Sequence, residues 1–323
     1  MSFIKLDKEI MDIICCPLCK NEVKIAENKI ICENCANEFP QHSVNTGEKN
    51  ENVFDFCIYN PDYCTPIEFK KWDDIQRGYE RRSKKGFSRN FTNNYYKSHL
   101  KQIKDDKKIY EEFKIKGKVL DVGGHIGKLR HFLPNGTDSF YISIDPFFKV
   151  FQDIKFQTDL QKAYPCLSKP CNFLACRAEK LPFIDNTFDW VHMRSVIDHF
   201  QNPYIALKEA HRVLKPNGML LIGASIENKG YDRKKKINKL KKQINPILIV
   251  IKLKNKIKKY GFQGIIEAIK LRSTKKIDGH MCKFTHDSLI NLLKTTNFSI
   301  EKEYQQIPPT NSIYISAKKQ NIK

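Results

Sequence analysis

The chain has 323 residues, enough for one large domain with a deep core and a smaller module, and its hydrophobic content of 41% excludes an intrinsically disordered chain. The formal net charge of +21 comes mostly from lysine, because only ten of the 57 basic residues are arginine. Arginine is best suited to bidentate phosphate recognition, so the charge alone is weak support for a nucleic-acid surface.

Eleven cysteines and the lack of an N-terminal apolar segment with a cleavage site favour a reducing compartment over a disulfide framework. The longest apolar run, residues 247–251, is far shorter than the roughly 20 residues that span a bilayer. We therefore expect a cytoplasmic protein without a transmembrane segment.

Two Cys-x2-Cys pairs near the N-terminus predict a zinc site, and their members are Cys16, Cys19, Cys32 and Cys35. Each pair places two thiolates on one side of a tight turn, and two facing pairs give tetrahedral sulfur coordination of Zn²⁺. Residues 22–31 between the pairs are typical of a hairpin. Four protein ligands leave no open position, so we expect a structural metal that supplies folding energy. Cys15 is an alternative ligand with poorer spacing.

The segment 14–40, with Cys16-Pro17, the second cysteine pair and Phe39-Pro40, resembles the Trm112-type zinc ribbon. Such ribbons occur as partner subunits or fused N-terminal modules of some methyltransferases. The resemblance covers about forty residues and implies a ribbon domain over residues 1–60.

Residues 61–115 predict a helical connector or cap, in which aromatic residues such as Trp72 and Tyr96 stand among lysines and arginines. Aromatic and basic side chains together suit the stacking of bases or sugars. The alternative is that these aromatics form the apolar faces of helices packed on the next domain.

A strand over residues 118–122 leads into the turn from Gly123 to Gly127, and residues 128–133 are expected to begin a helix. Glycine is needed where a Cβ would block the approach of the backbone to a ligand. The next strand, residues 140–144, is followed by Asp145, an acid placed to accept hydrogen bonds from ribose hydroxyls.

The rest of the chain continues the alternation of strands and helices. Strands are expected at 172–176, 188–193, 219–224 and 312–317, and helices at 203–214 and 285–293. This order predicts a parallel sheet with helices on both faces. A nicotinamide dinucleotide domain would share this layout, but it prefers G-x-G-x-x-G, and the spacing here does not supply it.

Four segments in order resemble the motifs of class I S-adenosylmethionine-dependent methyltransferases of the type 11 group: 119–127 (VLDVGGHIG), 141–145 (YISID), 178–191 (AEKLPFIDNTFDWV) and 206–218 (ALKEAHRVLKPNG). The resemblance covers about 190 residues. It implies a Rossmann-like α/β domain over residues 116–323, interrupted by a basic insertion at 231–276, with S-adenosylmethionine as cofactor beside the Zn²⁺ of the ribbon.

The resemblance also implies cofactor-binding residues around the ends of the strands. The methionine part of the cofactor would contact Asp121, Gly123, Gly124 and Gly127, and the ribose would contact Asp145. The adenine would lie beside Arg177, Ala178 and Glu179. The floor of the pocket toward the acceptor would run from Arg194 to His199. The alternatives are a helix-capping role for Asp145 and a tight turn alone for the glycines.

Two positions depart from the family pattern. His125 stands where the family has its middle glycine, and it would narrow the methionine end of the pocket. Arg177 stands where the family usually has an acid, and an arginine cannot accept a hydrogen bond from the adenine amino group.

Methyl transfer to a hydroxyl or amine also needs a base, for which His199 is the first candidate, with Asp198 and His192 behind it. The alternative for His199 is a packed or capping histidine. Neither Asn/Asp-Pro-Pro-Tyr nor Pro-Cys follows the strand at 188–193, so O-methylation, or N-methylation other than at an exocyclic base amine, is favoured.

We therefore expect a methyltransferase that acts on a small-molecule, glycan or lipid-linked acceptor. The insertion, over residues 231–260, suits peripheral contact with a membrane surface or a solvated lid. The ribbon and the positive charge keep an rRNA or tRNA methyltransferase, with RNA as its partner, as the alternative. A further alternative is a non-catalytic adaptor whose site is degraded by His125 and Arg177.

Overall fold

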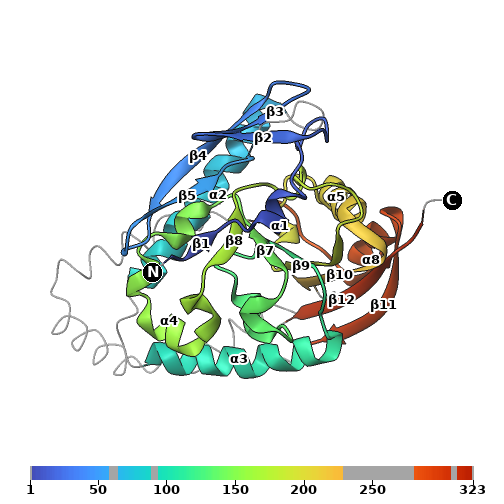
Figure 1. Cartoon of the computed structure of the whole chain (residues 1–323). Coiled ribbons are helices and arrows are strands. Elements are labelled where there is room, and N and C mark those ends of the chain that lie inside the picture. Colours follow the sequence, from blue (N-terminus) through green and yellow to red (C-terminus); the bar gives the residue numbers. More distant parts are fainter. Residues whose placement is uncertain (1, 58–64, 89–93, 228–279, 307–310, 322–323) are drawn as a thin grey trace. The chain divides into compact units, whose positions relative to one another are not determined.

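The computed structural model describes residues 2–57, 65–88, 94–227, 280–306 and 311–321 (Figure 1). The insertion predicted at 231–276, and with it the proposed membrane contact at 231–260, lies outside the described residues. Among the described residues, no helix combines the length and the apolar character needed to cross a membrane.

The strands, in chain order, are β1 (Ile4–Lys5), β2 (Val23–Ala26), β3 (Lys29–Cys32), β4 (Glu38–Asn45), β5 (Asn50–Phe54), β6 (Val119–Val122), β7 (Tyr141–Ile144), β8 (Cys171–Leu174), β9 (Phe188–Arg194), β10 (Leu214–Ser225), β11 (Phe298–Gln305) and β12 (Ser312–Lys319). The α-helices are α1 (Lys8–Met11), α2 (Pro66–Ser88), α3 (Asn94–Phe113), α4 (Thr158–Ala163), α5 (Pro203–Val213) and α8 (His286–Thr295). The 3-10 helices are η1 (Lys128–Phe132), η2 (Gly136–Asp138), η3 (Phe148–Phe151), η4 (Ile154–Phe156), η5 (Pro165–Ser168) and η6 (Ile197–His199).

Eight strands form the main sheet in the order β1-β8-β7-β6-β9-β10-β12-β11. In this sheet β1, β8, β7, β6, β9 and β10 run parallel to one another, whereas β12 is antiparallel to both of its neighbours, β10 and β11. The expectation of a parallel sheet is therefore corrected to a mixed sheet. The reason is that only a short segment joins β11 to β12, and a parallel pair would need a crossover of a dozen residues or more.

Helices cover both faces of this sheet, as expected (Figure 1). Alternate residues of the buried strands point to opposite faces. Leu120 of β6 belongs to the core shared with α5 and α8, whereas the preceding Val119 packs in the core that contains Ile109 of α3. The two stretches of core fix the sheet between α3 on one side and α5 with α8 on the other.

The helix expected at residues 128–133 is corrected to the short 3-10 helix η1. Pro134 follows Leu133, the residue after η1, and a proline disfavours helical backbone at the residue before it. Leu133 is accordingly extended, with φ −77° and ψ 147°.

The ribbon is a sheet of its own, in the order β2-β3-β4-β5, and β2 and β3 form the predicted hairpin. The segments on either side of this ribbon sheet join the edge of the main sheet. β1 pairs in parallel with β8, and Phe56 beyond β5 donates its amide to the Ala175 carbonyl at 2.7 Å. The edge of β8 is thus covered by the N-terminal region, and the carboxyl ends of β6, β7 and β9 lie side by side.

Candidate functional site

The turn after β6 is built on glycines. Gly123 and Gly127 have φ values of 69° and 79°, a left-handed backbone that favours glycine. A Cβ on Gly124 would lie 2.5 Å from the hydroxyl of Ser143 and 2.6 Å from the carboxyl carbon of Asp121. The turn therefore runs directly over the end of β7 and the Asp121 carboxylate, and a side chain at Gly124 would clash with both.

The two acids of the predicted site lie at the ends of neighbouring parallel strands. Asp121 of β6 stands in register with Ser143 of β7, so Asp145 follows the end of β7 beside the glycine turn. The side chain of Asp145 accepts a hydrogen bond from the Phe147 amide at 2.9 Å. Asp145 is 9% exposed and lies at the carboxyl end of the parallel strands.

Asp121 is buried and held by two side chains. Its Oδ1 lies 2.7 Å from Nδ1 of His192, and its Oδ2 accepts a hydrogen bond from the Tyr141 hydroxyl at 2.6 Å. His192 Nε2 in turn lies 3.2 Å from the Tyr110 hydroxyl. Burial, and after it the charge of Asp121, hold the pKa of Tyr141 well above its ordinary value, so this phenol stays a proton donor.

His125, in the glycine turn, has a positive φ of 54°. Burial, followed by the charge of Lys128, lowers the pKa of His125 to about 3. The imidazole is therefore neutral at physiological pH and adds bulk to the turn without adding charge.

Arg177 and Glu179 belong to a buried network at the end of β8. The Arg177 guanidinium lies 4.2 Å from the ring centroid of Trp72 on α2 and donates to Oε1 of Gln201 at 2.7 Å. The carboxylate of Glu179 accepts from the amides of Gln201 and Asn202, ahead of α5. Ala178, between the two, is buried.

Arg194, at the end of β9, is paired with α3. Its guanidinium donates to Oδ1 of Asp106 and lies 3.4 Å from the Tyr110 hydroxyl. The strand ends are therefore tied to the helix that covers this face of the sheet.

Asp198 and His199 lie in η6, the short helix beyond β9. The indole of Trp72 donates to the His199 carbonyl at 2.9 Å, and the Met281 amide donates to the Asp198 carbonyl at 2.7 Å. The side chain of His280 lies beside both residues, with its Nε2 at 3.4 Å from Oδ2 of Asp198. No motif in the sequence singled out His280, because it precedes α8 and lies far along the chain from η6.

The four ribbon cysteines come together as predicted, and Cys15 is not among them. Sulfur separations of 3.3 Å for Cys19 and Cys32 and 3.6 Å for Cys16 and Cys35 suit the edges of a tetrahedron around Zn²⁺, which are about 3.8 Å for Zn–S bonds of about 2.3 Å.

Each cysteine pair closes a similar turn. The residue after the second cysteine is left-handed in both turns, Lys20 with φ 62° and Ala36 with φ 54°. Its amide donates to the carbonyl of the first cysteine, at 2.9 Å in one turn and 3.1 Å in the other. The donor set and its geometry fit a structural Zn²⁺.

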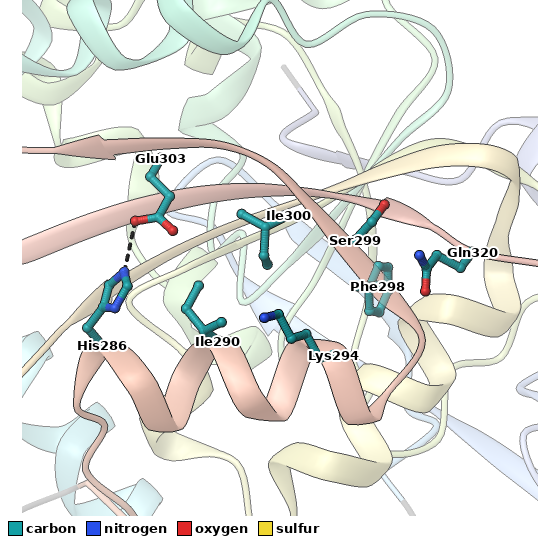
Figure 2. Close-up of a pocket in the computed structure, with 8 residues that line it drawn as sticks. All are labelled: His286, Ile290, Lys294, Phe298, Ser299, Ile300, Glu303 and Gln320. Atoms are coloured by element: carbon teal, nitrogen blue, oxygen red, sulfur yellow. Dashed lines mark hydrogen bonds and ion pairs between the residues drawn. The ribbon is translucent and has the colours of Figure 1, made fainter.

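A pocket also lies between α8 and β11, and none of the residues lining it belongs to the predicted site. Figure 2 shows His286 of α8 pointing toward Glu303 of β11, with 2.8 Å between the imidazole Nε2 and the carboxylate. This pair joins the helix to the edge strand.

Comparison with known proteins identifies both parts of the chain. Residues 120–222 match the family described as Methyltransferase domain, and residues 7–40 match the family described as Trm112p-like protein. These ranges contain the glycine turn and the four cysteines, respectively.

Among curated proteins, an uncharacterized protein of Methanocaldococcus jannaschii is 29% identical over 147 residues, which are 43% of this chain and 71% of that protein. An uncharacterized methyltransferase of Schizosaccharomyces pombe is 41% identical over 68 residues, 19% of this chain and 24% of its own. The curated methyltransferases among these relatives are matched over only 20% to 41% of their length.

A solved structure of 1,6-didemethyltoxoflavin-N1-methyltransferase from Burkholderia thailandensis covers 93% of this chain and 100% of its own at 12% identity, with a TM-score of 0.47. This distant likeness has no bearing on the substrate. The two family matches, with the sheet order and the four-cysteine cluster, show a Trm112p-like zinc ribbon in residues 7–40 and an S-adenosylmethionine-dependent methyltransferase domain around residues 120–222.

Proposed function

We propose that this protein transfers the methyl group of S-adenosylmethionine to a small-molecule, glycan or lipid-linked acceptor, by O- or N-methylation. The observation that carries the proposal is the placement of Asp121 and Asp145 at the ends of adjacent parallel strands, with the glycine turn beside them. A sugar and a charged amino-acid tail are two of the polar parts of the cofactor, and two acids placed in this way suit both.

The chain's own residues then divide the binding between them. A carboxylate has about four acceptor positions, so Asp145 accepts both the Phe147 amide and a ribose diol. Asp121, held by His192 and Tyr141, places negative charge directly under the turn, where the ammonium of the methionine part would lie.

The acceptor would be deprotonated near η6. Methyl transfer from a sulfonium is an in-line displacement, so the protein's main contribution is to align the nucleophile and exclude water. Of the candidate bases, His192 has both ring nitrogens within hydrogen-bond distance of protein groups, Asp121 and Tyr110. His199 of η6, with Asp198 beside it, is the base that we assign, as the first candidate from the sequence.

The covering of η6 favours a small acceptor group over a folded RNA. The side chains of Asp198 and His199 are only 16% and 17% exposed, between Trp72 of α2 and the segment that begins at His280. A sugar hydroxyl or the end of a lipid-linked chain fits such a site better than a duplex does.

Calorimetry with S-adenosylmethionine tests the cofactor part of the proposal. We expect micromolar or tighter binding, weakened about ten- to hundredfold in Asp145→Asn, since hydrogen bonds to a charged group contribute about 1.5–3 kcal/mol. Asp138→Asn, at an exposed aspartate of η2, is the matched control and should bind as the wild type does. Absence of binding in the wild-type chain would favour the non-catalytic adaptor.

Methyl-labelled S-adenosylmethionine tests the acceptor. The chain is incubated with a cell extract, which is then divided into small-molecule, lipid and RNA fractions. We expect label in the first two; label that enters the RNA fraction and is released by ribonuclease would establish the rRNA or tRNA alternative instead.

A further inference from the structure

A second cluster of metal-ligating side chains lies outside the ribbon. Asp198 and His199 of η6 and His280 each offer one ligand atom, and these three atoms all lie within 4.8 Å of one another. The rings of His199 and His280 have their centroids 4.8 Å apart. Two imidazoles and one carboxylate thus face a common point at the end of β9.

Backbone contacts hold the three residues together across the chain. The amides of Met281 and Cys282 both donate to the carbonyl of Asp198, at 2.7 Å and 3.2 Å. From the other side, Trp72 of α2 donates to the carbonyl of His199. The cluster is therefore positioned by hydrogen bonds to the main-chain carbonyls of both of its η6 residues, independently of the side chains that form it.

The spacing suits a shared cation better than direct hydrogen bonds. His199 Nε2 lies 4.0 Å from Oδ1 of Asp198, beyond hydrogen-bond distance, and His280 Nε2 lies 3.4 Å from Oδ2. Ligands at about 2.1 Å from a tetrahedral metal are about 3.4 Å apart. Oδ1 of Asp198 is also buried and accepts no hydrogen bond from any residue that the structure describes. A cation between the three side chains would satisfy that oxygen.

We propose that Asp198, His199 and His280 form a second metal site, which takes a divalent transition cation such as Zn²⁺ or Co²⁺. Imidazole and carboxylate donors suit these borderline cations, whereas Ca²⁺ and Mg²⁺ require mostly oxygen ligands. Three protein donors leave coordination positions for water or substrate, unlike the four thiolates of the ribbon. With the cation bound, His199 is a ligand and no longer the base, and the cation itself would lower the pKa of an acceptor oxygen. This catalytic role rests on the proposed function, whereas binding of the cation does not.

Metal content of the full chain tests this site. The purified protein is stripped of metal, reloaded with Co²⁺ and desalted, and cobalt per chain is measured by mass spectrometry together with the absorption spectrum. We expect about two cobalt ions per chain, of which only the ribbon ion shows thiolate-to-cobalt charge transfer. His280→Ala should retain about one, with the charge-transfer band unchanged.

His286→Ala is the matched control, because its side chain is 43% exposed and that of His280 is 44% exposed. It should retain both ions. Asp198→Asn, which keeps the shape of the side chain, should lose the same ion as His280→Ala, and circular dichroism of each variant checks its fold. A wild-type chain with a single cobalt ion, or a second ion that survives both substitutions, overturns the site.

The outcomes separate the metal site from the proposed function. A chain that binds S-adenosylmethionine in calorimetry but holds only the ribbon cobalt overturns the second site alone. A chain that holds two cobalt ions but does not bind S-adenosylmethionine retains the site and overturns the methyltransferase.

Discussion

Single residues at the end of β6 show how a charge is kept inside this protein. The Asp121 carboxylate is buried, and an unpaired buried charge is strongly destabilising. His192 and Tyr141 each contact a different oxygen of it. The negative charge under the glycine turn is therefore stabilised before any ligand arrives.

Tyr141→Phe removes one of these donors and leaves the buried carboxylate with one fewer hydrogen bond. We expect the free energy of unfolding to fall by about 1–3 kcal/mol, the usual cost of an unsatisfied buried polar group. Denaturant unfolding followed by circular dichroism measures it. Tyr204→Phe, at a ring that is 45% exposed, should change stability by no more than about 0.5 kcal/mol. Equal effects of the two substitutions would contradict the assigned role of the Tyr141 hydroxyl.

At the scale of elements, α5 is joined to the first cysteine turn by Glu209. Its carboxylate accepts from Lys20 at 2.9 Å and from Arg212 at 2.8 Å and 2.9 Å. Burial alone would raise the pKa of Glu209, but the hydrogen bond and charge of Arg212, and then Lys20, outweigh it and lower the pKa below its ordinary value of 4.5. The ionised form thus stabilises the contact between ribbon and helix.

The sign of the pH dependence follows from this lowered pKa. The stabilisation is complete above pH 4.5, the ordinary pKa of the side chain, and is lost as the pH falls through the lower value of the folded protein. We expect Glu209→Gln to lower the free energy of unfolding at pH 7 by about 1.5–3 kcal/mol, because it removes the charge from hydrogen bonds to two partly buried cations.

Unfolding at several pH values checks this prediction. The difference between wild type and Glu209→Gln should shrink below pH 4.5, and any loss of zinc in acid affects both proteins equally. A difference that stays constant from neutral to acid pH would show that the charge of Glu209 has no part in it.

For the whole described molecule, the ribbon and the main sheet are stabilised together. β1 pairs with the first residues of β8, and Phe56, two residues beyond β5, donates to the carbonyl of Ala175 just after β8. Cys16 and Phe39 of the ribbon pack in the same core as Leu181. A ribbon of this size cannot bury a sufficient core by itself, so metal binding contributes to its folding.

Removal of zinc should therefore lower the Tm of the methyltransferase domain as well as that of the ribbon. In a Trp72→Phe variant the remaining tryptophan, Trp190 in β9, reports on the main sheet, and its fluorescence during thermal unfolding in excess chelator measures the effect. Chelator already saturated with zinc is the control. An unchanged transition at Trp190 would mean that the ribbon folds without influence on the sheet.

Local patterns in the sequence determined much of this protein. The spacing of the four cysteines predicted the cluster, because each cysteine turn involves only a few consecutive residues. The strand and glycine turn after residue 118 were predicted for the same reason, since hydrophobic runs and glycines act locally. The ligand roles of Asp145 and His199 stay predictions until cofactor and acceptor are measured.

The tertiary structure decided what no local pattern encodes. β11 was missed, and β12, which pairs with it, runs antiparallel and makes the sheet mixed. β1, only two residues long, forms a strand because the edge of β8 supplies its hydrogen bonds. His280 lies beside Asp198 only because the segment before α8 bonds back to η6. Contacts between residues so far apart depend on the packing of the whole sheet, and sequence periodicity describes only the face that each element buries.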